Sequence, residues 1–353
     1  MSAVLQPGGA PAPLVIERSE GVWHAAWRRF RADRVGVRSL VVVIAFLLLI
    51  VLAATGLVAR SWQAEVGVSN APPSFMGPST EKAASVIESP KGPNVDLSSI
   101  DPLAPKYAEW AERAKSLGTA ETVKATTLPF GGDRLGRDVL AKAIKGTEIS
   151  VFVGVLAALI ATTIGTLLGA ASGFFGGKLG DFLEWLYNVI EAIPGILLIF
   201  ALAAALNQRG VTNVVLILGL TGWAGMYRQV RSEFIKHRGR DYVRAAEAIG
   251  ASVNSRMFRH ILPNISHVIL VHMSLLVVGF IKAEVILSYL GLGVSIDQVS
   301  WGTMLSEAQA ELILGNWWQL VAATLFMCVF VTAFSLMADA LRDALDPKLR
   351  GLE

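Results

Sequence analysis

The sequence predicts an all-α polytopic membrane protein with six transmembrane helices and a long extracytoplasmic segment after the first helix. Three observations predict this fold class. The chain of 353 residues is 53% hydrophobic and has a mean hydropathy of +0.54, which is too apolar for an ordinary soluble domain. Several apolar runs reach the roughly 18 to 20 residues that a helix needs to span a bilayer. Basic residues concentrate in particular segments between these runs, which orients a membrane protein.

The predicted N-terminal tail covers residues 1–38 and precedes the first transmembrane helix, which is predicted over residues 39–59. Six arginines stand against three acidic residues in the tail, and this bias predicts that it is cytoplasmic. Trp23, Trp27 and Phe30 recur at helical spacing, so the tail forms either a short amphipathic helix at the headgroup level or a disordered basic segment. No small-residue cleavage site follows the first run, so we expect an uncleaved span.

The polar segment of residues 60–147 is predicted to be extracytoplasmic, because it follows a span that starts in the cytoplasm. Proline is frequent in this segment, and its clearest helical pattern lies within residues 105–122. An extracellular sensor with a membrane anchor would need a folded outer domain. The proline-rich composition gives little sign of one.

Residues 148–340 are predicted to form a five-helix core, followed by a cytoplasmic tail over residues 341–353. The first core span carries Gly165, Gly169 and Gly173 at i, i+4 and i+8, a seam of small residues that lets another helix approach closely. The five spans are expected at about residues 149–171, 185–206, 211–227, 266–290 and 317–340.

A basic segment, residues 228–264, separates the fourth and fifth spans and is predicted to be cytoplasmic, since eight Lys and Arg stand against three acidic residues. Two short helices are expected in it. Asp241 can cap the first helix, and Gly250 ends it. Ser252 can cap the second helix, and Pro263 is expected to limit its length.

This segment carries a specific resemblance. Ala245-Ala246, then Gly250, then Leu262-Pro263 resemble the EAA loop of bacterial ABC importer permeases, E-A-A-x3-G-x9-I-x-L-P. An amphipathic helix lying on the membrane surface is the alternative interpretation, but surface binding does not require fixed Gly and Pro spacings.

Two positions depart from the motif, since Arg244 stands in place of its Glu and His260 in place of its Ile. Other stretches are similar to the oligopeptide, dipeptide and nickel branch of the family, and these are PFGGDRLGRDV (129–139), GFFGG (173–177), LSYLGLG (287–293), SWG (300–302) and RDALDPKLR (342–350).

The resemblance implies a type I ABC importer-like fold and a permease subunit that hydrolyses nothing itself. Its implied partners are a second homologous permease, two ATPase subunits or domains, and a periplasmic or extracellular solute-binding protein. It implies that ATP and Mg bind to the ATPases and no cofactor to this chain. Short peptides are the implied substrates. The implied location is the bacterial inner membrane, with both termini in the cytoplasm.

The resemblance also implies that the segment is a loop that couples to an ATPase. In it, two alanines keep the first helix slim. Met257, Phe258 and Ile261 offer an apolar contact, and Arg256 and Arg259 can pair with acidic residues of the ATPase. The complete expected set is Asp241, Arg244, Ala245, Ala246, Gly250, Arg256, Met257, Phe258, Arg259, Ile261, Leu262 and Pro263.

Ionisable residues inside spans are costly and usually face a bundle interior or a wet cavity. Glu191 lies well inside the third span, next to Pro194, which should kink it. Lys282 lies roughly 24 Å along the fifth span, where its ammonium can also snorkel to the interface. The residues expected along the translocation pathway and its outer mouth are Glu191, Pro194, Lys282, Glu284, Tyr289 and Trp301. For the last three, packing is the alternative role.

Other classes of function find weaker support. His260, His267 and His272 lack the spacing of a metal site, and no nucleophile–base arrangement stands out. Membrane orientation already explains the basic segment, so we expect no nucleic-acid partner. The main alternative is an ion-driven secondary transporter or channel, whose signature is buried carboxylates on several spans or paired broken helices.

Overall fold

The computed structural model describes residues 22–78, 102–116, 124–295 and 297–345. In these residues the regular structure is helical, with isolated β-bridges between loops. The helices are α1 (Val22–Ala32), α2 (Arg34–Ala54), η1 (Ser74–Met76), η2 (Ala104–Lys106), α4 (Tyr107–Ser116), α5 (Val139–Phe175), α6 (Gly177–Glu191), α7 (Gly195–Leu206), α8 (Val211–Thr221), α9 (Ala224–Arg238), α10 (Asp241–Ala248), η3 (Ser255–Ile261), α11 (Leu262–Tyr289), α12 (Trp301–Ile313) and α13 (Trp318–Leu345).

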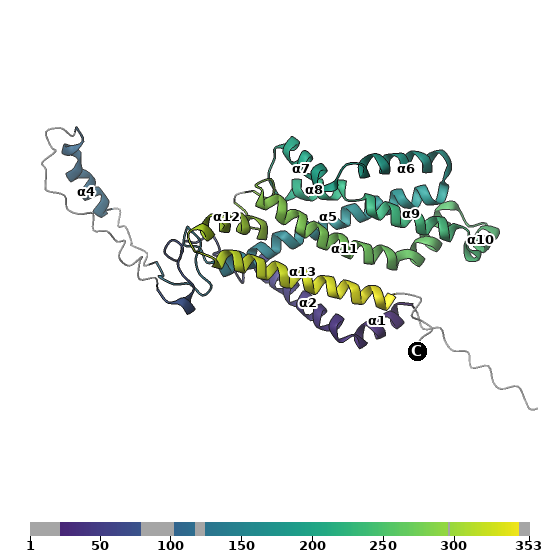
Figure 1. Cartoon of the computed structure of the whole chain (residues 1–353), viewed down its shortest axis with the longest axis horizontal. Coiled ribbons are helices and arrows are strands. Elements are labelled where there is room, and N and C mark those ends of the chain that lie inside the picture. Colours follow the sequence, from purple (N-terminus) through teal and green to yellow (C-terminus); the bar gives the residue numbers. More distant parts are fainter. Residues whose placement is uncertain (1–21, 79–101, 117–123, 296, 346–353) are drawn as a thin grey trace, which may run out of the picture.

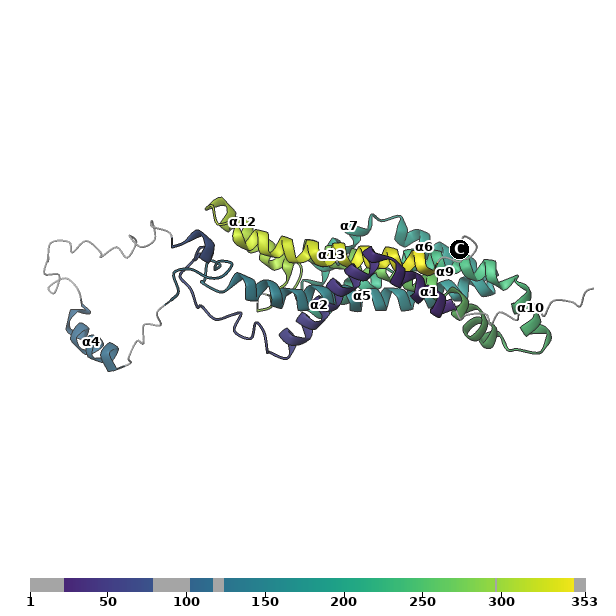
Figure 2. The same cartoon turned by 90° about the horizontal axis from the view of Figure 1, so that it is seen from below.

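The long helix α5 lies at the centre of the bundle and packs against α9, α11 and α8. Helices α6 to α9 lie on one side of it, and α13 lies on the other side with α1 and α2 (Figure 1). The bundle is elongated, with α12 near one end and α10 at the other (Figure 2). We call these the α12 end and the α10 end. The loops of residues 60–78 and 124–138 lie at the α12 end.

Four described helices are long and apolar enough to cross a membrane: Arg34–Ala54, Val139–Phe175, Ser255–Tyr289 and Trp318–Leu345. Helices α6 and α7 make a fifth if they count as one span, although they are bent by 82°. The structure thus supports a polytopic helical membrane fold, and the count of six spans stays a prediction.

The continuous fourth span expected over residues 211–227 is corrected, because the helix is interrupted between α8 and α9 at Gly222 and Trp223. A Cβ atom on Gly222 would lie 2.3 Å from the Cζ atom of Phe280, so the aromatic ring occupies the space beside this break. The Phe280 ring of α11 therefore leaves no space for a side chain at position 222.

The predicted glycine seam on α5 is confirmed. A Cβ atom on Gly169 would lie 2.7 Å from the carbonyl oxygen of Tyr227, and one on Gly173 would lie 2.6 Å from the carbonyl oxygen of Arg231. Gly165 is equally close to the same helix. The backbones of α5 and α9 therefore touch along three turns, which only glycine permits.

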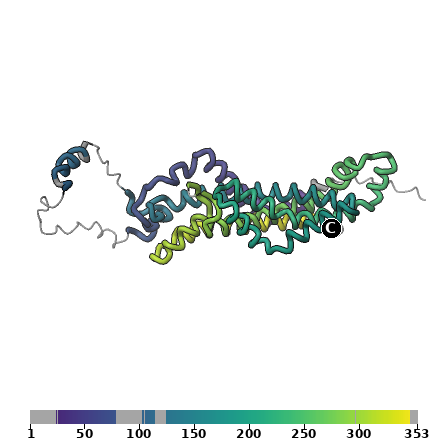
Figure 3. Tube along the Cα trace, turned by 90° about the horizontal axis from the view of Figure 1, so that it is seen from above, coloured from purple at the N-terminus to yellow at the C-terminus, as the bar shows by residue number. Residues whose placement is uncertain are grey.

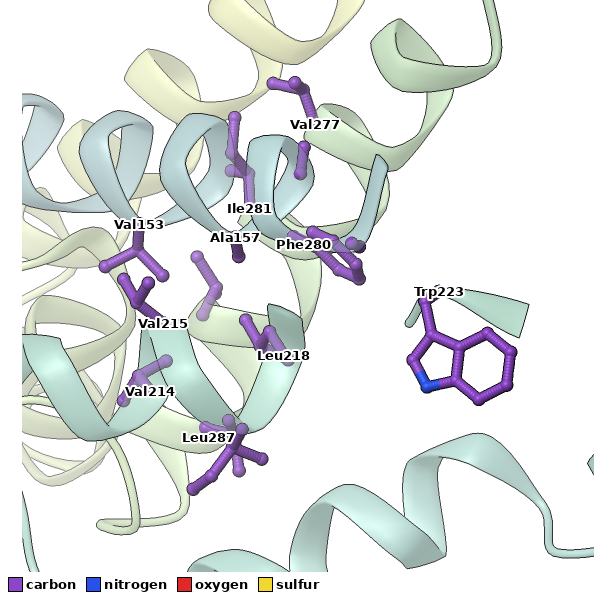
Figure 4. Close-up of a cluster of buried hydrophobic side chains, with 14 of the residues drawn as sticks. Val153, Ala157, Val214, Val215, Leu218, Trp223, Val277, Phe280, Ile281 and Leu287 are labelled. Carbon is purple, nitrogen blue, oxygen red and sulfur yellow. The ribbon is translucent and has the colours of Figure 1, made fainter. Parts of the chain in front are cut away.

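The main core joins side chains from α5, α8 and α11. Val153 and Ala157 of α5 meet Val215 and Leu218 of α8, with Ile281 of α11 closing the cluster (Figure 4). All of these side chains are buried. The core thus holds together three helices that are far apart in the sequence.

The N-terminal arginine-rich tail is helical from residue 22 onward, as α1, which favours the amphipathic helix over a disordered segment for this part. Phe30 is buried against Ala340 of α13, while Trp27 is 47% exposed. The Asp33 carboxylate accepts a hydrogen bond from the Val35 amide and caps α2. The first long helix therefore starts at residue 34 and ends at residue 54, earlier than the predicted 39–59.

Within the predicted segment 60–147, α4 confirms the short helix expected in residues 105–122. The last residues of the segment belong to α5 instead, because Asp138 caps that helix by accepting from the Leu140 amide. Helix α12 was not expected from the sequence. Its start is stabilised by a capping box between Ser300 and Thr303.

Candidate functional site

The α10–η3 segment, residues 241–261, projects at the α10 end of the bundle (Figure 3). Helix α10 begins after Arg240, and Asp241 lies in its first turn, so the expected capping role of Asp241 is corrected. A carboxylate in the first turn still interacts favourably with the helix dipole. The end of α10 is a Schellman motif: Gly250 has φ of +84°, and the Ala251 amide donates to the Ala246 carbonyl.

The second helix of this segment begins as expected, since the Ser252 hydroxyl oxygen accepts from the Ser255 amide at 3.3 Å. It does not end at Pro263, which corrects the prediction. The helix passes through a π-helical turn into α11, so that Ser255–Tyr289 forms one apolar helix of 35 residues.

The π-helical turn accommodates the proline. The Leu262 amide donates to the carbonyl of Met257, five residues earlier, which widens the turn directly before Pro263. The side-chain amide of Asn264 donates to the His260 carbonyl at 2.7 Å and satisfies an acceptor there. The apolar fifth span and the polar segment are therefore mechanically one helix.

One face of the segment is buried in the chain's own core. Val243 and Ala246 of α10 and Met257 and Ile261 of η3 are at most 4% exposed, and Phe234 of α9 packs into the same cluster. Met257 and Ile261 were expected to contact an ATPase. This expectation is corrected, because both side chains are buried within the chain itself. These side chains attach the segment to α5, α9 and α11.

Other expected coupling residues are exposed. Phe258 is 44% exposed, and Ile249, which was not in the predicted set, is 86% exposed. The exposed remainder of the predicted set is Asp241, Arg244, Ala245, Gly250, Arg259 and Pro263, and Leu262 is half-buried. Arg256 is used within the chain, because it pairs with Glu247 and lies over the Phe174 ring at 5.6 Å.

The junction of α9 and α10 carries a titratable group. The Nδ1 atom of His237 lies 2.8 Å from the Tyr242 hydroxyl, and Nε2 lies 3.4 Å from the Glu233 carboxylate. Burial lowers the pKa of His237, and the positive charges of neighbouring basic residues lower it further against the opposing effect of Glu233. The junction therefore favours a neutral imidazole.

The three residues expected at the outer mouth are mostly buried. Glu284 is fully buried and accepts hydrogen bonds from Ser150 and Ser288, both at 2.7 Å. Trp301 is also fully buried, and its amide donates to the Ser150 hydroxyl. In this conformation, Glu284 and Trp301 join α11, α5 and α12 and do not line an open surface. Tyr289 remains 39% exposed.

The other pathway candidates lie apart from these. Lys282 is exposed on α11. Glu191 is the last residue of α6 and Pro194 caps α7, so the predicted kink is confirmed as the 82° bend between these helices. Together with Thr221 and Phe280, both line a cavity of about 280 Å³ between the α6–α7 and α8–α9 breaks.

A buried ionic cluster at the α12 end was missed by sequence reasoning. The Lys142 ammonium is 1% exposed and binds the carboxylates of Asp133 and Glu307 and the Gln319 side chain. Arg137 pairs with the same Asp133 at 2.6 Å. The cluster joins the loop before α5 to α12 and α13. Two members of the cluster, Asp133 and Arg137, lie in the GGDRLGRD stretch that carries the family resemblance. No pattern in the sequence indicated that residues of α12 and α13 contact them.

Burial and charge shift the pKa values of Asp133 and of the nearby Glu311 in opposite directions. Burial by itself raises the pKa of Asp133, but the charges and hydrogen bonds of Lys142 and Arg137 outweigh it and hold that pKa below its usual value. Glu311 is 2% exposed and accepts from the Arg134 amide. Burial raises the pKa of Glu311, and the neighbouring acidic residues add to the rise.

Among the residues that the structure describes, no group of three or more His, Cys, Asp or Glu side chains is placed to hold a metal ion. His260, His267 and His272 are spread along one continuous helix from η3 into α11.

Comparison with known proteins identifies two matching families. Residues 165–351 match the binding-protein-dependent transport system inner membrane component family, and residues 21–73 match the N-terminal TM domain of oligopeptide transport permease C. The oligopeptide transport system permease protein OppC of Bacillus subtilis (strain 168) is 36% identical over 247 residues, which cover 70% of this chain and 80% of that protein.

Two further similarities are weaker. The dipeptide transport system permease protein DppC of Lactococcus lactis subsp. cremoris (strain MG1363) is 28% identical over 323 residues, covering 92% of this chain and 90% of that protein. A chain of the inward-facing MetNI methionine ABC transporter aligns with a TM-score of 0.48 at 14% identity, covering 58% of this chain and 96% of that chain.

The first family match spans more than half of the chain and contains the α10–η3 segment and both helix breaks. Paired broken helices were named above as a signature of an ion-driven transporter, and this structure has them. The family match, and not the breaks, therefore decides between an ABC importer permease and an ion-driven transporter. The resemblance in the α10–η3 segment is thereby confirmed. The chain belongs to the binding-protein-dependent transport system inner membrane component family.

Proposed function

We propose that this chain is one of two permease subunits of an ATP-driven importer of short peptides. The peptide class is supported by the relatives, which are oligopeptide and dipeptide transport permeases. The proposed partners are a second homologous permease, two ATPase subunits or domains, and a periplasmic or extracellular solute-binding protein. ATP and Mg bind to the ATPases, and this chain hydrolyses nothing itself.

We place the α10 end in the cytoplasm and the α12 end outside. The arginines of α1 and the basic residues of α9, α10 and η3 lie toward the α10 end. Clusters of Lys and Arg favour the cytoplasmic side of a membrane. Both termini are then cytoplasmic. The chain is a multi-pass protein of the inner membrane.

The exposure of Ile249 is the observation that carries the coupling proposal. It is 86% exposed at the Schellman turn between α10 and η3, in a polar segment outside the long apolar helices. Burying such a side chain against a partner stabilises the complex by about 1.5 to 3 kcal/mol. We therefore propose that this turn is seated in a cleft of an ATPase subunit.

The same segment is built to transmit motion. Its buried face is fixed to α5 and α9 by Val243, Met257 and Ile261. Because η3 continues into α11 without a break, a displacement of the turn moves the start of the fifth span directly. Nucleotide-driven movement of the ATPases would thus reach the pathway through a rigid connection.

The Gly250 turn allows a sharp test. No atom lies within 4 Å of a Cβ atom built on Gly250, so a substitution acts through the positive φ or through the partner's surface. Gly250→Val cannot adopt this conformation without strain, whereas Gly250→Asn tolerates it. We expect Gly250→Val to insert in the membrane and to lose ATP-driven uptake in the complete transporter, with Gly250→Asn retaining more of it.

Loss of uptake in both variants, with weakened recovery of the ATPases on co-purification, would show that close approach of the partner matters more than turn geometry, and would still support docking. Normal assembly and normal uptake by Gly250→Val would contradict the coupling role of this segment.

A further inference from the structure

Two interrupted helices meet in the cavity that contains Glu191. The α6–α7 break at residues 192–194 lies beside the α8–α9 break at residues 222–223, and α7 packs against α8 (Figure 1). Glu191 lies about 10 Å along α6 beyond Glu184, the last charged residue before it, and α8 rises about 16 Å to its own break, at 1.5 Å per residue. Both breaks therefore fall within the roughly 30 Å hydrocarbon layer and not at its surface.

The cavity is lined by apolar residues except for the Glu191 carboxylate and the Thr221 hydroxyl. Its volume is about 280 Å³, near the lower end for ligand pockets. Leu198 and Phe280 contribute to its apolar wall, and Glu191 is the one charged residue that lines it. The Thr221 hydroxyl donates to the Ile217 carbonyl at 2.7 Å, which leaves its oxygen free to accept.

No described ion pair neutralises Glu191, and no basic side chain lines the cavity with it. Glu191 is exposed on this chain, and a carboxylate at this depth of a membrane requires a cationic partner or water. A divalent metal ion does not suit the cavity, because Mg²⁺ and Ca²⁺ take six or more oxygen ligands and no second acidic residue is present. An ammonium group on an apolar body suits both the charge and the walls.

The aromatic wall is fixed in place. The Phe280 ring fills the space beside Gly222, where a Cβ atom would lie 2.3 Å from Cζ. Phe280 is only 7% exposed, and it lies on the side of the core cluster that faces Trp223 (Figure 4). The ring lines the same cavity as the Glu191 carboxylate, and an aromatic ring attracts an organic cation that lies over its face.

We propose that this cavity binds the N-terminal residue of the transported peptide, with the Glu191 carboxylate pairing with its α-ammonium group and the apolar walls holding its side chain. The volume admits one end of a peptide and not a whole oligopeptide. This inference rests on the proposed peptide substrate and adds a recognition site within the membrane to it.

The test compares Glu191→Gln with the wild-type chain in the complete transporter, reconstituted in vesicles with its binding protein. The two substrates are a peptide with a free N-terminus and the same peptide N-acetylated, each loaded on the binding protein to the same occupancy. Removing a hydrogen bond to a charged group should lower initial uptake of the free peptide about tenfold or more. Uptake of the acetylated peptide should be unchanged.

Asp181→Asn is the matched control, since Asp181 is an exposed carboxylate of the same helix and does not line the cavity. It should transport both peptides at the wild-type rate. Glu191→Asp retains the charge and should keep part of the preference for the free N-terminus.

Equal loss of uptake for both peptides, or no loss for either, would overturn the assignment. Failure of Glu191→Gln to assemble with the second permease would also overturn it, because Glu191 would then pair across the subunit interface. Wild-type vesicles that import neither peptide would contradict the proposed peptide substrate instead.

Discussion

Arg256 of η3 forms an ion pair with Glu247 of α10 across the turn that contains Gly250. Arg256 is 16% exposed and also lies over the Phe174 ring, whereas Glu247 is 62% exposed. The pair therefore links the two arms of the α10–η3 segment to the end of α5. Because the Glu247 carboxylate is largely exposed, solvent screens the ion pair, whereas the Arg256 side chain also packs on the Phe174 ring.

We expect Arg256→Ala to destabilise the chain by about 1 to 2 kcal/mol, because it removes the ion pair and the cation–π contact. Glu247→Ala should cost about 0.5 kcal/mol, since an exposed pair contributes little. Thermal unfolding of the single and double variants gives the coupling energy between them. A larger loss for Glu247→Ala than for Arg256→Ala would contradict this order.

The buried ammonium of Lys142 gives the largest expected effect. Lys142→Met leaves the fully buried Asp133 with Arg137 as its remaining cation, so we expect about 3 kcal/mol of destabilisation and a lower yield of folded protein. Lys145→Met is the matched control, because its ammonium is 24% exposed and pairs with Glu148. It should cost less than about 1 kcal/mol in the same unfolding measurement.

The glycine seam makes a prediction about helix packing. Gly169→Ala places a Cβ atom against the Tyr227 carbonyl oxygen, and backbone atoms cannot move aside as a side chain can. We expect a loss of about 1 to 3 kcal/mol. Gly279→Ala meets no atom within 4 Å and should be neutral or stabilise by up to about 1 kcal/mol. Equal effects of the two substitutions on thermal stability would show that α5 and α9 are not in close contact.

The orientation can be measured by thiol labelling of intact cells. Cys328 is replaced by Ser, and a cysteine is introduced at the exposed Ser61 or Ala248. The proposed topology predicts that a membrane-impermeant reagent labels the Ser61→Cys variant and does not label the Ala248→Cys variant until the membrane is opened. The reverse pattern would place the α10 end outside the cell and contradict the coupling proposal.

The pH dependence of stability follows from Glu311 and His237, which act in opposite directions. The pKa of Glu311 is raised on folding, so its contribution to stability grows as pH falls through its folded pKa toward about 4.5. The pKa of His237 is lowered, so stability is lost as pH falls below about 6.5. The lowered pKa of Asp133 matters only below about 3.8.

Glu311→Gln isolates the first contribution. Between pH 7.5 and pH 5, the wild-type chain should gain stability relative to this variant. The thermal midpoint of the wild type minus that of the variant should therefore rise as pH falls. His237→Gln should show the opposite trend relative to wild type. A difference for Glu311→Gln that stays constant over this range would indicate that Glu311 has no raised pKa.

The apolar runs and arginine clusters were enough to predict a helical membrane protein, because transfer of a helix into a bilayer depends on local composition. Local rules also predicted the glycine seam, the Ser252 cap, the bend at Pro194 and the end of the first coupling helix at Gly250. Each of these depends on a few adjacent residues. The family resemblance rested on the same kind of local pattern.

Features set by contacts between distant residues could not be predicted in this way. Pro263 was expected to end a helix, and a π-helical turn together with the Asn264 side chain carries the helix past it. The requirement for glycine at position 222 comes from the Phe280 ring, 58 positions later in the chain. The burial of Glu284 depends on the Ser150 hydroxyl of α5, which lies far away in the sequence and which the pattern of the fifth span does not reveal.

Composition and short motifs thus determined the membrane class, the approximate spans and the position of the α10–η3 segment, because hydrophobic length, charge bias and turn chemistry act over neighbouring residues. Only the tertiary structure decided which side chains of that segment are exposed. It also decided that Lys142 is neutralised by carboxylates from a loop and from α12 and hydrogen-bonded by Gln319 of α13. It also brought two broken helices together around Glu191. The reason is that burial and charge pairing depend on the distances between helices, which the order of residues along one helix does not contain.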